Sequence, residues 1–126
     1  MKKRLEPSAL RKPLRDFLEE MFDTMSINNS YIYKTARMSP HTYSRVIKGN
    51  EPPGSRDRFL IACIIQIRDS FEDKIISDDE HKTLLEKLRR VGGDTVIVAE
   101  KFDTRVLNDF LLQAYKRSCN RFKNNK

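Results

Sequence analysis

The sequence predicts an all-helical fold, and three observations lead to that prediction. Apolar residues recur at three- and four-residue spacing in segments 14–25 and 106–115, which is the period of an amphipathic helix. Start and stop signals for helices bracket two further segments, Ser39 to Gly49 and Ser77 to Gly93. The apolar run 59–67 is long and has helical neighbours, so it predicts a buried central helix and not a strand.

The chain has 126 residues, enough for one domain with a core and too few for two. We divide it into a basic N-terminal arm over 1–12, a main domain over 13–76 and a C-terminal helical extension over 77–126. The extension either packs on the main domain or serves as a dimerisation surface.

The charge of the chain is basic and unevenly distributed. There are 25 Lys and Arg against 18 Asp and Glu, a net charge of +7. Basic residues concentrate in 2–15, 34–58 and 115–126, whereas 69–80 holds six acids and a single base. A basic face opposite an acidic one suits a polyanionic partner, although an ordinary solvated surface is the alternative.

The first half of the chain predicts three helices before the apolar run. A helix of about three turns begins at Pro13. After a polar break, Asn29 or Ser30 caps a short helix over 31–37. Ser39 then caps a third helix, 40–48, that Gly49 ends. Its inward face holds Tyr43, Val46 and Ile47, and its polar face holds Pro40, His41, Ser44, Arg45 and Lys48.

The second half continues the helical pattern. A helix begins at Ser55, and a further short turn or helix is expected around Ile75. Ser77 opens a capping box for the next helix. For the apolar triplet 96–98 we expect a packed loop in preference to a strand, since no partner strand is evident. Asp103 caps a final helix with an apolar stripe. The stripe either closes the core or forms the interface of a homodimer, and the candidate dimer face consists of Leu107, Phe110, Leu111, Ala114 and Tyr115.

Several classes of function are not expected. No nucleophile accompanies the two histidines, His41 and His81, and no metal or cofactor motif is found, so we expect neither an enzyme nor a metal or cofactor site. Cys63 lies within the apolar run and is therefore predicted to be a buried thiol. No segment has the length of a membrane span or the pattern of a signal peptide, which predicts a cytoplasmic protein without a membrane partner.

Double-stranded DNA is the partner that the segment 31–48 favours. Two short helices joined by a tight turn form the arrangement that inserts its second helix into the major groove. On that hypothesis the base-reading residues are Pro40, His41, Ser44 and Arg45, with Arg45 suited to guanine. The phosphate contacts are expected at Tyr31, Lys34, Arg37, Thr42, Lys48 and Asn50.

The pattern Ile32 to Arg37, Met38-Ser39, Thr42 to Ile47, Gly49 and Pro53 resembles the Cro and lambda-repressor-like helix-turn-helix family, also called the XRE family. The resemblance covers residues 14–70 and implies a five-helix DNA-binding domain in a bacterial or phage transcriptional regulator, acting as a homodimer. Two residues depart from the pattern: Tyr33 replaces a small Ala, and Arg37 replaces the usual Gly. The competing hypothesis is a protein-interaction module on the same fold, of the antitoxin or phage-inhibitor kind; RNA binding ranks third, since no aromatic stacking platform is evident.

Overall fold

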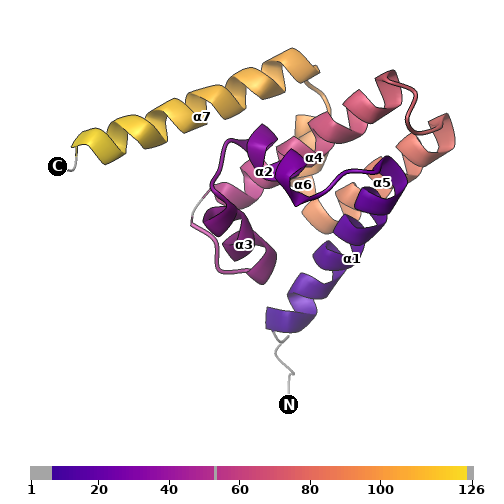
Figure 1. The fold of residues 1–126 in the computed structure, drawn as a ribbon, viewed down its shortest axis with the longest axis horizontal. Helices are drawn as coiled ribbons and strands as arrows, with labels where there is room; N and C mark the ends of the chain where they lie inside the picture. The colour runs from indigo at the N-terminus through magenta and orange to yellow at the C-terminus, as the bar shows by residue number, and fades with distance from the viewer. Residues whose placement is uncertain (1–6, 53, 125–126) are drawn as a thin grey trace.

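Seven helices and no strand make up the described part of the protein in a computed structural model, which covers residues 7–52 and 54–124 (Figure 1). The all-helical fold class is thereby confirmed for these residues. In chain order the helices are α1 (Pro7–Met25), α2 (Asn29–Ala36), α3 (Pro40–Lys48), α4 (Ser55–Glu72), α5 (Asp78–Gly92), α6 (Asp94–Ala99) and α7 (Thr104–Asn124).

Helix α4 is the centre of the fold, as its apolar run predicts. It packs against α2, α3, α5, α6 and α7, while α1 lies against α3 and α5. Nine consecutive residues of α4, 59–67, are buried except for Gln66. Gln66 is half-buried, and its amide donates a 2.8 Å hydrogen bond to the hydroxyl of Thr35 on α2. Burial on several sides explains why the segment 59–67 lacks a polar face.

The N-terminal helices begin earlier than the sequence predicts. Helix α1 starts at Pro7 instead of Pro13, so the expected arm is helical over 7–12, and residues 1–6 lie outside the described part. Pro7 supplies the same first-turn signal as Pro13, six residues earlier. Helix α2 is capped by Asn28, not by Asn29 or Ser30, because the Asn28 Oδ1 accepts the Ser30 amide at 3.0 Å.

The triplet 96–98, expected to be a packed loop, belongs to the short helix α6. Gly93 turns the chain with φ of 64°, and Val96 and Ala99 then face the core one turn apart. Gly92 has no Cβ, which leaves room for the side chains of Val96 and Leu60. A six-residue helix is not stable alone, so this packing, and not local propensity, explains why it forms.

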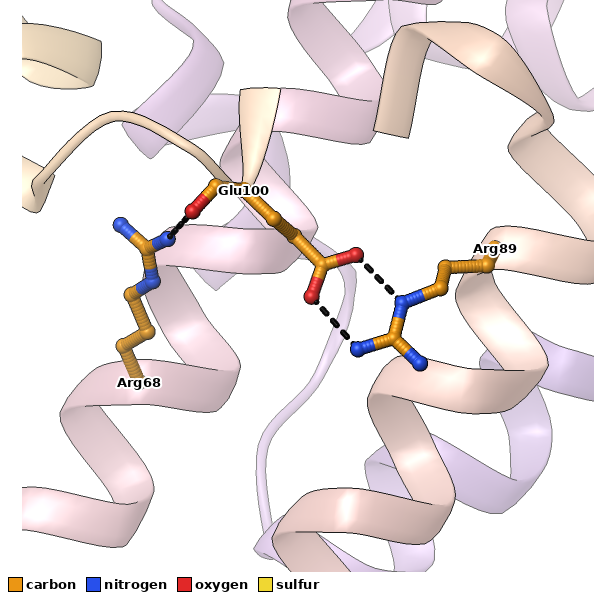
Figure 2. Close-up of polar contacts among 3 residues, drawn as sticks. All are labelled: Arg68, Arg89 and Glu100. Atoms are coloured by element: carbon orange, nitrogen blue, oxygen red, sulfur yellow. Dashed lines mark hydrogen bonds and ion pairs between the residues drawn. The ribbon is translucent and has the colours of Figure 1, made fainter. Parts of the chain in front are cut away.

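Three residues fix the segment between α6 and α7 (Figure 2). The Arg68 guanidinium on α4 donates a hydrogen bond to the main-chain oxygen of Glu100 at 3.0 Å. It donates a second, at 2.9 Å, to the main-chain oxygen of Phe102. The Glu100 carboxylate turns the other way and accepts two hydrogen bonds from Arg89 of α5, at 2.7 and 2.8 Å. The start of α7 is therefore tied to both α4 and α5.

Helix α7 leaves the other helices part-way along its length (Figure 1). The Asp103 carboxylate accepts the Val106 amide at 3.0 Å, which confirms the predicted cap. The helix continues to Asn124, and residues 125–126 lie outside the described part. Leu107 and Leu111 are buried in the chain's own core, so these two residues of the expected dimer seam are not exposed to a partner.

The turn between α4 and α5 carries the acidic block. Phe71 lies in the last turn of α4 and stacks on His81, with the ring centroids 4.2 Å apart. No separate helix forms around Ile75, which is exposed, whereas Ile76 is buried. The predicted capping box is present: the Ser77 hydroxyl accepts the Glu80 amide, and the Glu80 carboxylate accepts the Ser77 amide.

Candidate nucleic-acid interface

Helix α3 has the bounds and the caps that its sequence predicts. The Ser39 hydroxyl accepts the Thr42 amide at 3.1 Å, and Pro40 occupies the first turn, where a missing N–H costs nothing. Gly49 ends the helix at φ of 84°, and its amide donates to the oxygens of Arg45 and Val46. The helix is thus defined locally, by residues at its two ends.

The inner face of α3 is held by Tyr43. Its ring lies 5.6 Å from the ring of Tyr33 on α2 and 5.7 Å from that of Phe59 on α4, measured between centroids. Its hydroxyl donates a 2.6 Å hydrogen bond to Asn29 Oδ1 at the start of α2. Burial raises the pKa of the Tyr43 phenol above its usual value, so the group stays protonated and keeps this bond. Tyr33 therefore adds an aromatic contact between the two helices.

The outer face of α3 is polar and basic. His41, Arg45 and Lys48 are exposed and lie opposite the buried Tyr43 and Val46. The Arg45 Nε donates to the main-chain oxygen of Asn50 at 3.1 Å, which orients the side chain along the end of the helix. A guanidinium has five N–H donors, so this bond leaves donors for a second partner.

The turn between α2 and α3 is built on an arginine in the left-handed conformation. Arg37 has φ of 58° and ψ of 47°, and its amide donates to the main-chain oxygens of Tyr33 and Lys34. Glycine would adopt this conformation without strain, whereas a residue with a Cβ pays about 1–2 kcal/mol. Arg37 thus makes the tight turn and places a cation on it.

Eight of the ten predicted contact residues are exposed: Tyr31, Lys34, Arg37, Pro40, His41, Arg45, Lys48 and Asn50. The other two, Ser44 and Thr42, are half-buried. The Thr42 hydroxyl is 3.2 Å from the Ser39 hydroxyl, and Thr42 lines a hollow shared with α7.

A second hollow, of about 750 Å³, lies between α3 and the α1–α2 pair. Four predicted residues line it together with Arg15 of α1: Pro40, Ser44, Lys48 and Asn50. Arg15 is not among the contact residues that the sequence predicts. Its position beside α3 depends on the packing of α1 against α3, for which the local pattern around Arg15 contains no signal.

Charge separates along the molecule. Residues 28–50 contain four Lys or Arg and no acid, whereas the acidic block 69–80 lies at the α4–α5 turn. Helix α4 has 18 residues, so it spans about 27 Å from the loop after α3 to that turn (Figure 1). Phosphate groups at α3 would therefore be far from the acids.

Three results concern other kinds of site. Among the described residues no group of His, Cys, Asp and Glu has an arrangement that could hold a metal ion. No described helix has the length and apolar character needed to cross a membrane. Cys63 is fully buried, and burial raises its thiol pKa, as expected of a structural cysteine.

Comparisons with known proteins add no assignment: no protein-family model, curated protein sequence or solved structure matches the chain.

Proposed function

We propose that this protein binds double-stranded DNA as a helix-turn-helix transcriptional regulator of the lambda-repressor-like kind, reading the major groove with α3. The observation that carries the proposal is the outer face of α3, on which His41, Arg45 and Lys48 are exposed while Tyr43 and Val46 anchor the helix beneath. A capped helix whose exposed side is polar and basic, preceded by a second short helix, meets the requirement for docking in the major groove.

Base reading falls to polar residues on the outer side of α3. Arg45 offers two parallel N–H groups to the O6 and N7 atoms of guanine, and His41 and Ser44 offer single hydrogen bonds to base edges. Pro40 has no donor and contributes apolar contact, for example with a thymine methyl. Most of the base specificity is therefore assigned to Arg45.

Phosphate contacts surround this reading face on three elements. Lys34 and Arg37 come from α2 and its turn, Lys48 and Asn50 from the end of α3, and Arg15 from α1. Such contacts set the register of the protein on the duplex and carry no sequence information. They predict affinity that falls steeply with salt, because each neutralised phosphate releases counterions.

The test is a binding titration against random and genomic duplexes at several salt concentrations, with wild type, Arg45→Ala, Lys34→Ala and Arg90→Ala. Arg45→Ala is expected to cost about 1–3 kcal/mol on the preferred site and to relax site preference. Lys34→Ala is expected to weaken binding on all duplexes alike and to reduce the salt slope by about one unit. Arg90 is a matched control, since its side chain is 71% exposed on α5 and pairs with Glu86.

Loss of binding in Arg90→Ala equal to that in Arg45→Ala would mean that net charge, and not α3, governs binding. Weak binding that is unaffected by Arg45→Ala and abolished by salt would contradict the proposal. That outcome would favour the protein-interaction module, which a pull-down with the full chain would then test.

A further inference from the structure

An apolar hollow of about 490 Å³ lies where α6 and the first half of α7 meet α4. Three of the residues that line it, Ile61, Ala99 and Leu107, belong to the buried core. Four others are large and apolar and yet between 43% and 51% exposed: Val98, Phe102, Val106 and Phe110. Apolar side chains gathered around a concave surface are typical of small-molecule sites, whose volumes are roughly 300–1,000 Å³.

Two carboxylates are the only charged groups among the described residues that line this hollow. Asp57 belongs to the first turn of α4 and Asp94 to the first turn of α6. The Thr95 hydroxyl donates a 3.3 Å hydrogen bond to Asp57 Oδ1, and a carboxylate has room for further donors. In the described part of the chain, neither carboxylate forms an ion pair with a Lys, Arg or His. The hollow therefore combines apolar walls with negative charge that no side chain neutralises.

We propose that this hollow binds a small organic cation that has an aromatic or alkyl body and a protonated amino group. The apolar body lies against Phe102, Val106 and Phe110, where its removal from water is favourable. The ammonium group lies at Asp94, with Asp57 as its second partner. Asp94 is assigned the main contact because it lines only this hollow, whereas Asp57 also lines a neighbouring polar hollow together with Arg58 and Arg117.

Other kinds of ligand fit the hollow less well. An anion would meet two carboxylates with no cation among the lining residues to offset them, which argues against phosphate groups and nucleic acids. An uncharged apolar molecule would gain the apolar contact alone. A protein partner in a standard interface covers about 800 Å² on each side, whereas the exposed apolar side chains here surround one hollow of small-molecule size.

The hollow is separate from the proposed DNA interface. None of the ten residues predicted to contact DNA lines it, and it is built from α4, α6 and α7 without α2 or α3. The proposal therefore does not rest on DNA binding, and it is tested in the absence of DNA.

The test is an NMR titration of the isotope-labelled full chain with three compounds that share a phenyl ring and a butyl chain. They are phenylbutylamine, phenylbutanol and phenylbutyrate, which are a cation, a neutral molecule and an anion at pH 7. The amine is expected to cause saturable shifts of amide signals in α6 and the first half of α7. The alcohol should bind about fivefold more weakly, because it lacks the charge that pairs with exposed carboxylates, and phenylbutyrate should not bind measurably.

Variants of the lining residues test the assigned contacts. Asp94→Asn should lower the affinity for the amine about fivefold and leave the affinity for the alcohol unchanged. Phe102→Ala should weaken the binding of both compounds, because it removes part of the apolar wall. Asp79→Asn is the matched control and should bind the amine as the wild type does. Asp79 is also an exposed acid in the first turn of its helix, α5, but it does not line the hollow.

Equal affinities for the three compounds, or shifts that do not saturate, would overturn the proposal. Equal effects of Asp94→Asn and Asp79→Asn would do the same. The comparison of the three compounds uses the wild type alone, so it does not depend on the folding of any variant. A Lys-rich amphipathic helical peptide that saturates the same amide signals while the amine does not would also overturn the proposal, and would assign the hollow to a protein partner.

Discussion

The Tyr43 hydroxyl lies 2.6 Å from Asn29 Oδ1, and this hydrogen bond joins the middle of α3 to the first residue of α2. It acts together with the ring contacts of Tyr43 to Tyr33 and Phe59. The angle between the two short helices is therefore set by one side chain that makes both apolar and polar contacts.

Tyr43→Phe removes only the hydrogen bond. We expect the free energy of unfolding to fall by about 0.5–1.5 kcal/mol, because Asn29 is exposed and regains a water partner. Urea denaturation measures the change. Tyr43→Ala, which also removes the ring, should cost about 3–5 kcal/mol, and equal losses in the two variants would show that the ring contacts contribute little.

Arg68→Ala should destabilise the α6–α7 segment. Two main-chain oxygens, those of Glu100 and Phe102, lose a charged donor, so we expect a loss of about 1–2 kcal/mol in urea denaturation. Glu100→Gln weakens only the pair with Arg89, whose side chain is 44% exposed, and should cost less than about 1 kcal/mol. A larger effect from Glu100→Gln would mean that the carboxylate, and not the main chain, holds the segment.

Gly92→Ala should destabilise the contact between α5 and α6. A Cβ at this position would overlap the Val96 side chain and come within 3.1 Å of Leu60, so α6 must shift, at about 1–3 kcal/mol. Gly54→Ala shows the effect of backbone strain alone, because Gly54 has φ of 81° and a Cβ added there would have no atom within 4 Å. Gly54→Ala should cost about 1–2 kcal/mol and should leave amide hydrogen exchange in α6 unchanged. Gly92→Ala should speed amide hydrogen exchange in α6.

Asp69→Asn should stabilise the protein at neutral pH. Partial burial raises the pKa of the Asp69 carboxyl, and the nearby Glu72 and Asp73 raise it further. A raised carboxyl pKa means that the folded state binds the proton more tightly, so the ionised group destabilises the fold above the folded-state pKa. Below the ordinary aspartate pKa the group is protonated in both states, and the penalty vanishes.

The expected gain from Asp69→Asn at pH 7 is about 0.5 kcal/mol, in line with like-charge pairs one turn apart and an acid near a helix C-terminus. Thermal unfolding of both proteins between pH 3 and pH 7 measures it. A gain that stays constant across that range would show that charge is not the cause.

Local sequence signals were sufficient to predict much of the fold. Ser39 with Gly49 and Ser77 with Glu80 defined α3 and the start of α5, because caps act within one turn of the chain. The unbroken apolar run predicted that α4 is central. The boundaries of α1 and α2 were less accurate, since Pro7 and Pro13, or Asn28 and Asn29, offer the same local signal.

Long-range contacts decided what the local pattern left open. Helix α6 exists because Gly92 admits Val96 against Leu60, a contact between residues far apart in the chain. Arg15 lies beside the candidate interface because α1 packs on α3. Thr42 lines the hollow that α7 shares.

The last helix separates the two kinds of information most clearly. The sequence by itself determined that α7 is amphipathic and that its basic residues follow its acidic ones, since both are properties of residue order. Only the tertiary structure decided that Leu107 and Leu111 enter the core while Val106 and Phe110 stay exposed beside α6. The physical reason is that a stripe of apolar residues specifies a buried face, whereas the packing of α4 and α6 determines which part of it is already covered.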